Sequence, residues 1–205
     1  MQITGIQDWN KRRCKIELDG EYAFTLYKGE LRTYGIYEGG ELSASAFQSI
    51  MTEVLPKRAK LRAMALLKEK PYTERQLSDK LKDGGYPEEI RRAAIDYVKS
   101  FHYVDDASYA KDYITQQMDT RSRMRIEQDL QKRGIRKEII QAAFDELADD
   151  GACQDETEMI RRFLQQKHYD PETATRQDQQ KLMAALYRKG FSIDKIKRCF
   201  HYTDD

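Results

Sequence analysis

Side chains that could bind a metal ion are scattered along the chain. The three histidines are His102, His168 and His201, and no two of them lie three or four residues apart. A spacing of three or four residues would be needed for one helix to present two imidazoles to the same zinc ion. We therefore expect no metal site and assign the histidines to helix ends and surfaces.

The cysteines also lack the pattern of a reactive or ligating site. Cys14, Cys153 and Cys199 are an odd number, lie far apart and include no C-x-x-C pair, which is typical of a reducing compartment. We interpret all three as small core residues or bystanders. The chain has no apolar stretch of about 18 residues and no signal-peptide pattern, so we expect a cytoplasmic location without membrane contact.

Motifs of enzyme active sites are absent from the sequence. It contains no G-x-x-x-x-G-K-[ST], G-x-G-x-x-G or G-x-S-x-G segment. Three acidic pairs fall at expected helix starts, in loops or among the last residues: Asp105-Asp106, Asp149-Asp150 and Asp204-Asp205. Helix capping or solvated charge explains such pairs better than acid–base catalysis. We therefore expect no enzymatic activity and no cofactor.

Basic side chains are concentrated between residues 121 and 137, where the only acids are Glu127 and Asp129. One interpretation is a docking surface for an acidic protein or for phosphate, and the other is a solvated face partly paired with those acids. The run contains no aromatic residue, which argues against stacking on single-stranded nucleic acid there. The candidate partner-binding residues are Arg121, Arg123, Arg125, Lys132, Arg133, Arg136 and Lys137, with a second basic surface at Lys57, Arg58, Lys60 and Arg62.

The proportion of charged residues also indicates the fold class. Of the 205 residues, 35% are charged and 40% are hydrophobic, yet the net charge is only +1. An average soluble domain has about 25% charged residues, so this chain has a large solvated surface for its core. An elongated helical array exposes more surface per residue than a compact globule and is favoured here.

The first 42 residues alternate between apolar and polar side chains, which predicts β-strands. The alternating apolar residues of the two strands share one face only if the loop has three residues, 18–20. This loop pairs Ile16 with Tyr22 and Cys14 with Phe24, and it places Gly20 in the left-handed conformation of a bulge. A short third strand is expected near residues 40–42. So small a sheet must dock on another element to be stable.

From Ser43 onward the apolar residues follow a helical period. Ser43 is expected to cap a helix that is disrupted or restarted at Pro56. Pro71 ends the next helix, and the segment 73–76 (Thr-Glu-Arg-Gln) predicts a capping box for another.

A repeated frame shows how these helices are organised. In this frame a leucine lies four residues before a glycine, and an apolar residue follows the glycine directly. A small residue stands nine positions after the glycine and a large apolar residue ten positions after it. The frame occurs three times, beginning with the segments 81–86, 130–135 and 186–191. Each frame predicts a helix that ends at a left-handed glycine and a second helix that starts two or three residues later. The glycines are 49 and 56 residues apart, which leaves room for a third helix in each unit.

The sequence therefore predicts a mainly α fold in which three tandem three-helix modules form an elongated, curved array with a small N-terminal β extension. The expected segments are 1–56 for the β extension with its connecting helix, and 57–106, 107–155 and 156–205 for the modules. In the third module, Lys195 occupies the place of Ile90 and Ile139, and Ile196 is expected to pack in its stead.

Several segments resemble the RecX family of bacterial recombination regulators. They are the linker Tyr103-Val-Asp-Asp-Ala-Ser-Tyr-Ala110, the frame Leu130-Gln-Lys-Arg-Gly-Ile135 and the segment Pro71-Tyr-Thr-Glu-Arg-Gln-Leu77. Ile3-Thr-Gly-Ile6 together with Leu18-Asp-Gly-Glu-Tyr-Ala23 is similar to the β extension of some members. The resemblance covers essentially the whole chain.

This resemblance implies a non-enzymatic regulatory protein that binds the filament of the RecA recombinase. It would insert along the filament groove and inhibit ATP hydrolysis, strand exchange and the SOS coprotease activity, with consequences for DNA recombination and DNA repair. DNA phosphates within the filament would be a further contact of its basic surface, and we expect a monomer. The alternative is a helical module that binds DNA directly, against which the near-zero net charge argues.

Overall fold

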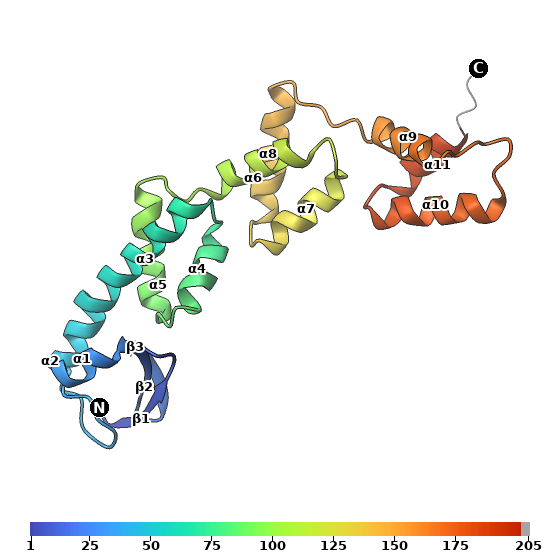
Figure 1. Cartoon of the computed structure of the whole chain (residues 1–205). Coiled ribbons are helices and arrows are strands. Elements are labelled where there is room, and N and C mark those ends of the chain that lie inside the picture. Colours follow the sequence, from blue (N-terminus) through green and yellow to red (C-terminus); the bar gives the residue numbers. More distant parts are fainter. Residues whose placement is uncertain (202–205) are drawn as a thin grey trace. The chain divides into compact units, whose positions relative to one another are not determined.

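The computed structural model describes residues 1–201 and consists of two compact units, Met1–Asp105 and Asp106–Asp205. Most of the described chain is helical, and a small sheet lies in the first unit (Figure 1). The mainly α fold with an N-terminal β extension is thus confirmed. The side chain of His201 and the pair Asp204-Asp205 lie outside the described residues.

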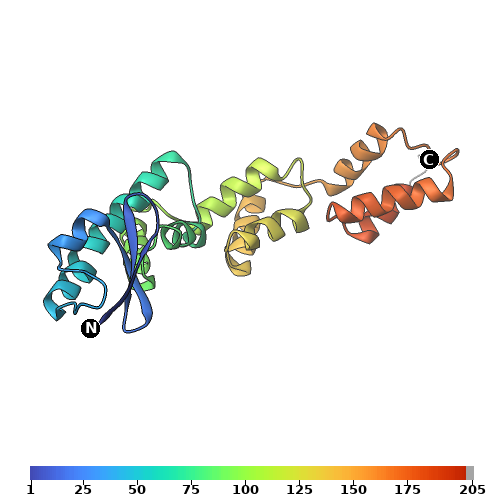
Figure 2. The same ribbon diagram turned by 60° about the horizontal axis from the view of Figure 1, so that its bottom comes forward.

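The sheet lies at the blue, N-terminal end of the chain in Figure 2. It has three antiparallel strands in the order β1-β2-β3, which span Ile3–Asp8, Arg13–Leu18 and Glu21–Tyr27. The third strand is therefore β1, and its expected position near residues 40–42 is wrong. Of that segment, only Glu41 forms a β-bridge in the described structure, and its partner is Gln2. β1 takes the place because it pairs with β2 and places Ile3 fully in the core.

The β2–β3 hairpin also differs from the expected three-residue loop. Leu18 pairs with Glu21 across a two-residue turn in which Asp19 and Gly20 have φ values of 51° and 89°, as a type I′ turn requires. A bulge after the next pair, Glu17 with Tyr22, restores the apolar face, because it places Ile16 opposite Phe24. The extra residue that keeps the apolar side chains on one face thus lies within β3, and not in the loop as the alternation of apolar residues predicts.

The helical part of the first unit begins with α1, Lys28–Thr33, and α2, Ala44–Ser49. The Ser43 hydroxyl accepts a hydrogen bond from the Ala46 amide at 3.2 Å, so the expected cap is confirmed. The helical backbone continues through a π-helical segment, η1 (Ile50–Val54), into α3 (Leu55–Glu69). Pro56 lies at the start of α3, directly after the π-helical segment, so the regular α-helical pattern is disrupted there as expected.

Three helices form each module. They are α3, α4 (Glu74–Lys82) and α5 (Glu88–Ser100); α6 (Asp106–Gln117), α7 (Arg123–Lys132) and α8 (Lys137–Asp149); and α9 (Glu156–Gln166), α10 (Arg176–Arg188) and α11 (Ile193–His201). Thr73 and Gln76 form the predicted capping box, with both hydrogen bonds at 3.2 Å. No helix in residues 1–201 is both long and apolar enough to cross a membrane.

The repeated glycines end α4, α7 and α10 as predicted. Gly85, Gly134 and Gly190 have φ values of 78°, 92° and 89°. In each case the next residue donates its N–H to the carbonyl of the frame's leucine, at 3.2, 3.1 and 3.3 Å respectively. This is the Schellman arrangement, and the residue after each glycine is buried.

The substitution expected in the third module is confirmed, because Ile196 is fully buried. The second module uses the same position, since Ile140 is buried there and Ile139 only partly so. Ile90 is the buried residue of the first module. Lys195 is consequently free to make a polar contact.

Candidate partner-binding surface

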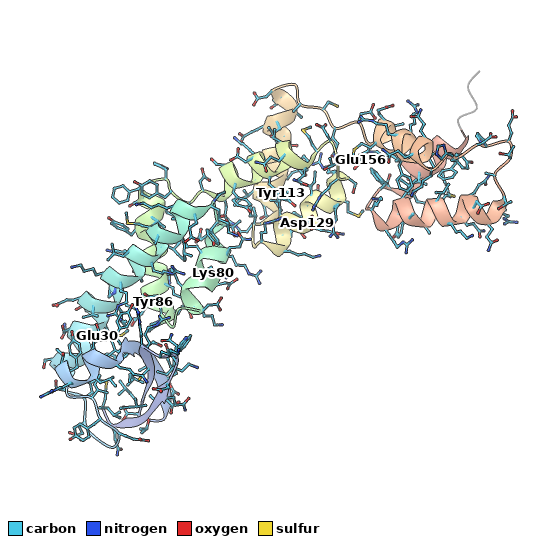
Figure 3. The ribbon with its side chains drawn as sticks, viewed as in Figure 1. Glu30, Lys80, Tyr86, Tyr113, Asp129 and Glu156 are labelled. Atoms are coloured by element: carbon cyan, nitrogen blue, oxygen red, sulfur yellow. The ribbon has the colours of Figure 1, made fainter. Side chains whose placement is uncertain are left out.

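Asp129 on α7 organises the first half of the basic run. Its side chain is 11% exposed and forms an ion pair with Arg121. Its Oδ1 lies 3.5 Å from Nε of Arg125. The Tyr113 hydroxyl of α6 donates at 3.4 Å to Oδ2, the oxygen that pairs with Arg121. Tyr113 and Asp129 are labelled in Figure 3. The two arginines therefore stabilise a mostly buried carboxylate of their own module.

Arg133 belongs to the same cluster. Its guanidinium lies 4.2 Å from the ring centroid of Tyr113 and donates to the Asp129 carbonyl at 3.3 Å. Burial acts to lower the pKa of Arg133, but a hydrogen bond to Tyr113 and nearby negative charge outweigh it and raise the pKa. The side chain keeps its positive charge while it packs on the module.

Arg123 contacts different elements. Its Nε lies 3.0 Å from a Glu127 carboxylate oxygen, and its Nη2 donates to Gln141 of α8 at 3.0 Å. The guanidinium also lies 4.3 Å from the ring centroid of Phe144. These contacts fix Arg123 against α8.

The last three basic residues of the run are exposed. Lys132 ends α7, Arg136 is the N-cap of α8, and Lys137 begins α8. None of the three forms an ion pair with a carboxylate in the described part of the chain. The seven candidate residues thus divide into four that support the fold and three whose charge is available to a partner.

The second basic surface divides in the same way. Arg58 forms an ion pair with Glu30 and lies 4.5 Å from the ring centroid of Tyr27. Lys60 lies 4.6 Å from the ring centroid of Tyr97. Lys57 and Arg62 are exposed and have no ion pair with a described residue.

These two surfaces offer charge for recognition rather than groups arranged for bond-breaking. Within residues 1–201, no group of three or more His, Cys, Asp or Glu side chains is placed to hold a metal ion. The exposed ammonium and guanidinium groups at residues 132–137 can attract an anionic surface and orient it.

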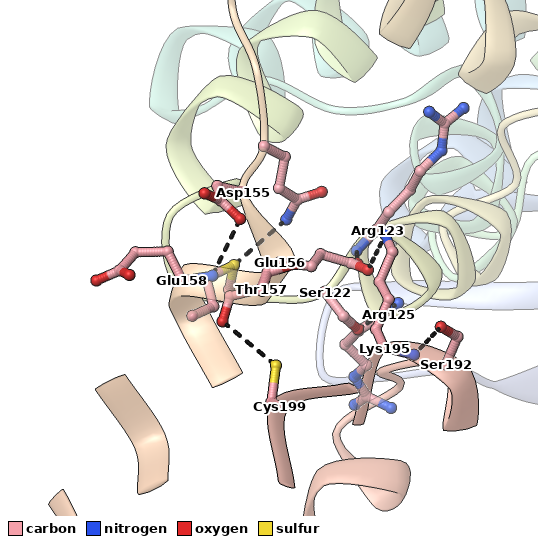
Figure 4. Close-up of polar contacts among 12 residues, drawn as sticks. Ser122, Arg123, Arg125, Asp155, Glu156, Thr157, Glu158, Ser192, Lys195 and Cys199 are labelled. Carbon is pink, nitrogen blue, oxygen red and sulfur yellow. Dashed lines mark hydrogen bonds and ion pairs between the residues drawn. The ribbon is translucent and has the colours of Figure 1, made fainter. Parts of the chain in front are cut away.

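Sequence reasoning missed a polar joint within the second unit (Figure 4). The carboxylate of Glu156, a residue that is 8% exposed, accepts from the Arg123 amide at 2.7 Å and from Lys195 Nζ at 2.8 Å. The Ser122 hydroxyl donates to the Lys189 carbonyl at 2.7 Å. The joint ties α7 to α9 and to the loop before α11. Its only signal in the sequence is the polar Lys195 at an otherwise apolar position of the repeat.

Comparison with known families finds three matches that follow one another along the chain. The first three-helix domain of RecX matches residues 59–97, the second matches 105–143 and the third matches 154–200. These matches fall on the three modules seen in the structure.

Curated relatives match over nearly the full length. "Regulatory protein RecX" of Caldanaerobacter subterraneus subsp. tengcongensis is 35% identical, with 99% of this chain and 100% of the relative covered. The protein of the same name from Clostridium botulinum, strain Eklund 17B, is 26% identical, with 94% and 90% covered.

Solved structures share the fold. A crystal structure described as regulatory protein RecX has a TM-score of 0.63 and 25% identity, and covers 97% of this chain and 98% of its own. RecX from Lactobacillus salivarius has a TM-score of 0.58 and 22% identity, with 71% and 94% covered. With all three domains matched in order and a relative similar over its whole length, this chain belongs to the RecX family of regulatory proteins.

Proposed function

We propose that this protein binds the RecA recombinase filament in the cytoplasm and inhibits its ATPase, strand-exchange and SOS-coprotease activities, without enzymatic activity of its own. The observation that carries the proposal is the ordered match of all three RecX domains, together with 35% identity to a regulatory protein over 99% of the chain.

The repeated modules support this role physically. A tandem array can present similar surfaces at intervals, so that contacts to successive filament subunits add to one another through high effective concentration. The elongated, curved form of the array stays a prediction; it would let the chain follow a helical groove. A monomer suffices for this mode of binding.

A titration of RecA tests the proposal. The purified chain is expected to lower DNA-dependent ATP hydrolysis and strand exchange by RecA at substoichiometric to equimolar ratios. Unchanged rates of both reactions across that range would contradict the proposal.

The basic surface has its own test. Reversing Arg121, Arg125 and Arg133 would place carboxylates beside Asp129 and disturb the fold. Reversal of Lys132, Arg136 and Lys137 to Glu instead changes exposed charge only, and should raise the concentration needed for half-inhibition about tenfold by slowing association. The thermal midpoint should stay unchanged.

Reversal of Lys57 and Arg62 provides the comparison in the first unit. If that variant loses inhibition while the first variant keeps it, the RecA-binding surface is the second basic surface and not residues 132–137. If both variants inhibit fully, neither basic surface sets the affinity.

A further inference from the structure

A groove in the first unit combines aromatic rings with positive charge. Its volume is about 420 Å³, which lies in the range of about 300–1,000 Å³ common for ligand sites. The sheet and the loop between α4 and α5 form its walls. The aromatic residues are Trp9, Tyr22 and Tyr86, and the cations are Lys15, Lys82 and Arg91.

The walls of the groove are fixed by direct contacts between the sheet and the α4–α5 loop. The Tyr22 hydroxyl donates to the Gly85 carbonyl at 2.7 Å, and Arg13 donates to the Gly84 carbonyl at 2.8 Å. A Cβ atom at Gly85 would lie 2.3 Å from Oγ1 of Thr25. The Tyr22 ring and the α4–α5 loop are therefore held in place before any ligand binds, which reduces the entropy cost of binding.

The positive charge of the groove is not neutralised by the protein. Lys15, Lys82 and Arg91 form no ion pair within residues 1–201, and Glu88 is the only acid that lines the groove. Nε of Arg91 is buried without a hydrogen-bond partner among the described residues. The Arg91 guanidinium thus has no acidic partner in the described chain, and its other nitrogens can pair with a bound phosphate.

Aromatic faces next to cations are the combination that single-stranded nucleic acid requires. A base stacks on an aromatic ring, for about 1–3 kcal/mol per base, while its flanking phosphates meet the cations. The Lys15 ammonium lies 4.6 Å from the centroid of the Trp9 ring, so a base that stacks there would displace the ammonium toward its own phosphate. An acidic peptide would draw Lys15 away without offering a ring to replace it, and would leave the exposed Tyr22 without a matching group. The observations therefore favour a nucleotide over a peptide.

The turn next to the groove favours a strand of nucleic acid over a free nucleotide as the ligand. Lys11 and Arg12 are exposed in the turn that follows Trp9, and the Asn10 side chain fixes this turn by accepting the amides of Arg12 and Arg13 at 2.9 and 3.0 Å. Their charge extends beyond the groove, where the next phosphates of a strand would lie.

We propose that this groove binds single-stranded nucleic acid, with one base against Trp9 and Tyr22 and the flanking phosphates on Lys15, Lys82 and Arg91. The proposal does not depend on the proposed contact with RecA, because it is tested without RecA.

The test uses the fluorescence of Trp9, which is the only tryptophan of the chain. Titration of the full chain with oligothymidylate of about 12 nucleotides, without RecA, should quench this fluorescence in a saturable manner. The apparent dissociation constant should rise with salt concentration. No binding, or binding without a change at Trp9, would overturn the proposal.

Matched variants locate the site. Lys82→Gln, alone and with Arg91→Gln, should weaken binding, by about tenfold for the pair. Lys80→Gln removes the same charge from the same helix outside the groove (Figure 3) and should change affinity less than about twofold. Equal losses for Lys80→Gln and Lys82→Gln would contradict the assignment, and Lys82→Gln, a change at an exposed position, keeps the test valid if Arg91→Gln unfolds.

Two competitors identify the occupant. Thymidine monophosphate should bind much more weakly than the oligonucleotide, and equal affinity would assign the groove to free nucleotides instead. Oligoglutamate should not displace the oligonucleotide, and displacement at equal charge concentration would assign the groove to acidic protein segments.

Discussion

The carboxylate of Asp129 holds together side chains from α6, α7 and the loop between them. Its contacts are Arg121, Arg125 and the hydroxyl of Tyr113. Because the side chain is only 11% exposed, its loss would leave two cations close together with no counter-charge. A dense basic sequence is tolerated here because one acid is placed at its centre.

Asp129→Ala should lower the free energy of unfolding by about 1–3 kcal/mol, because hydrogen bonds to a charged group are lost, while Arg121 and Arg125 stay hydrated at the surface. Urea unfolding followed by far-UV circular dichroism measures it. Asp112→Ala on α6 is the control, since Asp112 is exposed, and should change stability by no more than about 0.5 kcal/mol. Similar losses for the two variants would mean that the Asp129 contacts add nothing.

His168 occupies a backbone conformation that suits glycine. Its φ is 50°, and the following Tyr169 amide donates to the Leu164 carbonyl at 3.0 Å, as at the repeated glycines. A left-handed conformation costs a side-chain-bearing residue about 1–2 kcal/mol, partly offset by the greater freedom of glycine in the unfolded chain.

His168→Gly should therefore raise the free energy of unfolding by about 0.5–1 kcal/mol. His168→Ala removes the same imidazole without relieving the backbone and should give no gain. Thermal unfolding of the two variants side by side separates the explanations. A gain for alanine as large as that for glycine would place the cause in the imidazole.

At the scale of elements, the glycine cap loop has two uses. It ends a helix, and it lets the loop approach a neighbouring element. At Gly85 a Cβ would meet Oγ1 of Thr25 at 2.3 Å, and at Gly190 it would meet Oγ of Ser122 at 2.6 Å. The same local motif thus docks the first module on the sheet and the third module on the start of α7.

Gly190→Ala should destabilise the chain more than Gly151→Ala. Both glycines have a φ of 89°, but a Cβ at Gly151 meets nothing within 4 Å. Gly151→Ala should cost only the backbone term of about 1–2 kcal/mol, and Gly190→Ala should cost more because it also pushes Ser122 away from Lys189. Urea unfolding compares them, and equal costs would show that the Gly190 loop tolerates a methyl group.

Local signals predicted the elements well where one segment decides the outcome. Ser43, the capping box at Thr73 and the three glycine frames each depend on residues within one turn. The hairpin register and the position of the third strand depend on pairing partners elsewhere in the sheet, so the alternation of apolar residues alone does not predict them correctly.

The candidate site shows the same limit. The basic character of residues 121–137 was evident from residue types, but the division into paired and unpaired cations was not. Asp129 meets Arg121 and Tyr113 only because α6, α7 and the loop between them fold together. The groove at Trp9 is formed by residues more than 70 positions apart in the sequence, so no short sequence motif predicts it.

At the scale of the whole molecule, the apolar core is divided into three clusters. The first includes the sheet and the first module, from Ile3 to Val104; the second lies in α6–α8 and the third in α9–α11. The second and third clusters are much smaller than the first, and cooperativity between separate cores is limited.

Unfolding by urea should therefore give different midpoints for Trp9 fluorescence and for far-UV circular dichroism. Trp9 reports on the first unit alone, whereas helices of both units contribute to the dichroism. Superimposable transitions would show that the two units unfold as a single cooperative body.

Modules of a repeat protein are often treated as exchangeable building blocks, but the third module of this chain is not one. Its Lys195 stands at the position where Ile90 of the first module is buried, and its amine is matched to Glu156. The same carboxylate accepts the Arg123 amide at the start of α7, so the third module is fitted to the second module before it. A second copy of the third module would carry the pair of Glu156 and Lys195 with it, but it would need a helix start like that of α7 before it to receive the carboxylate.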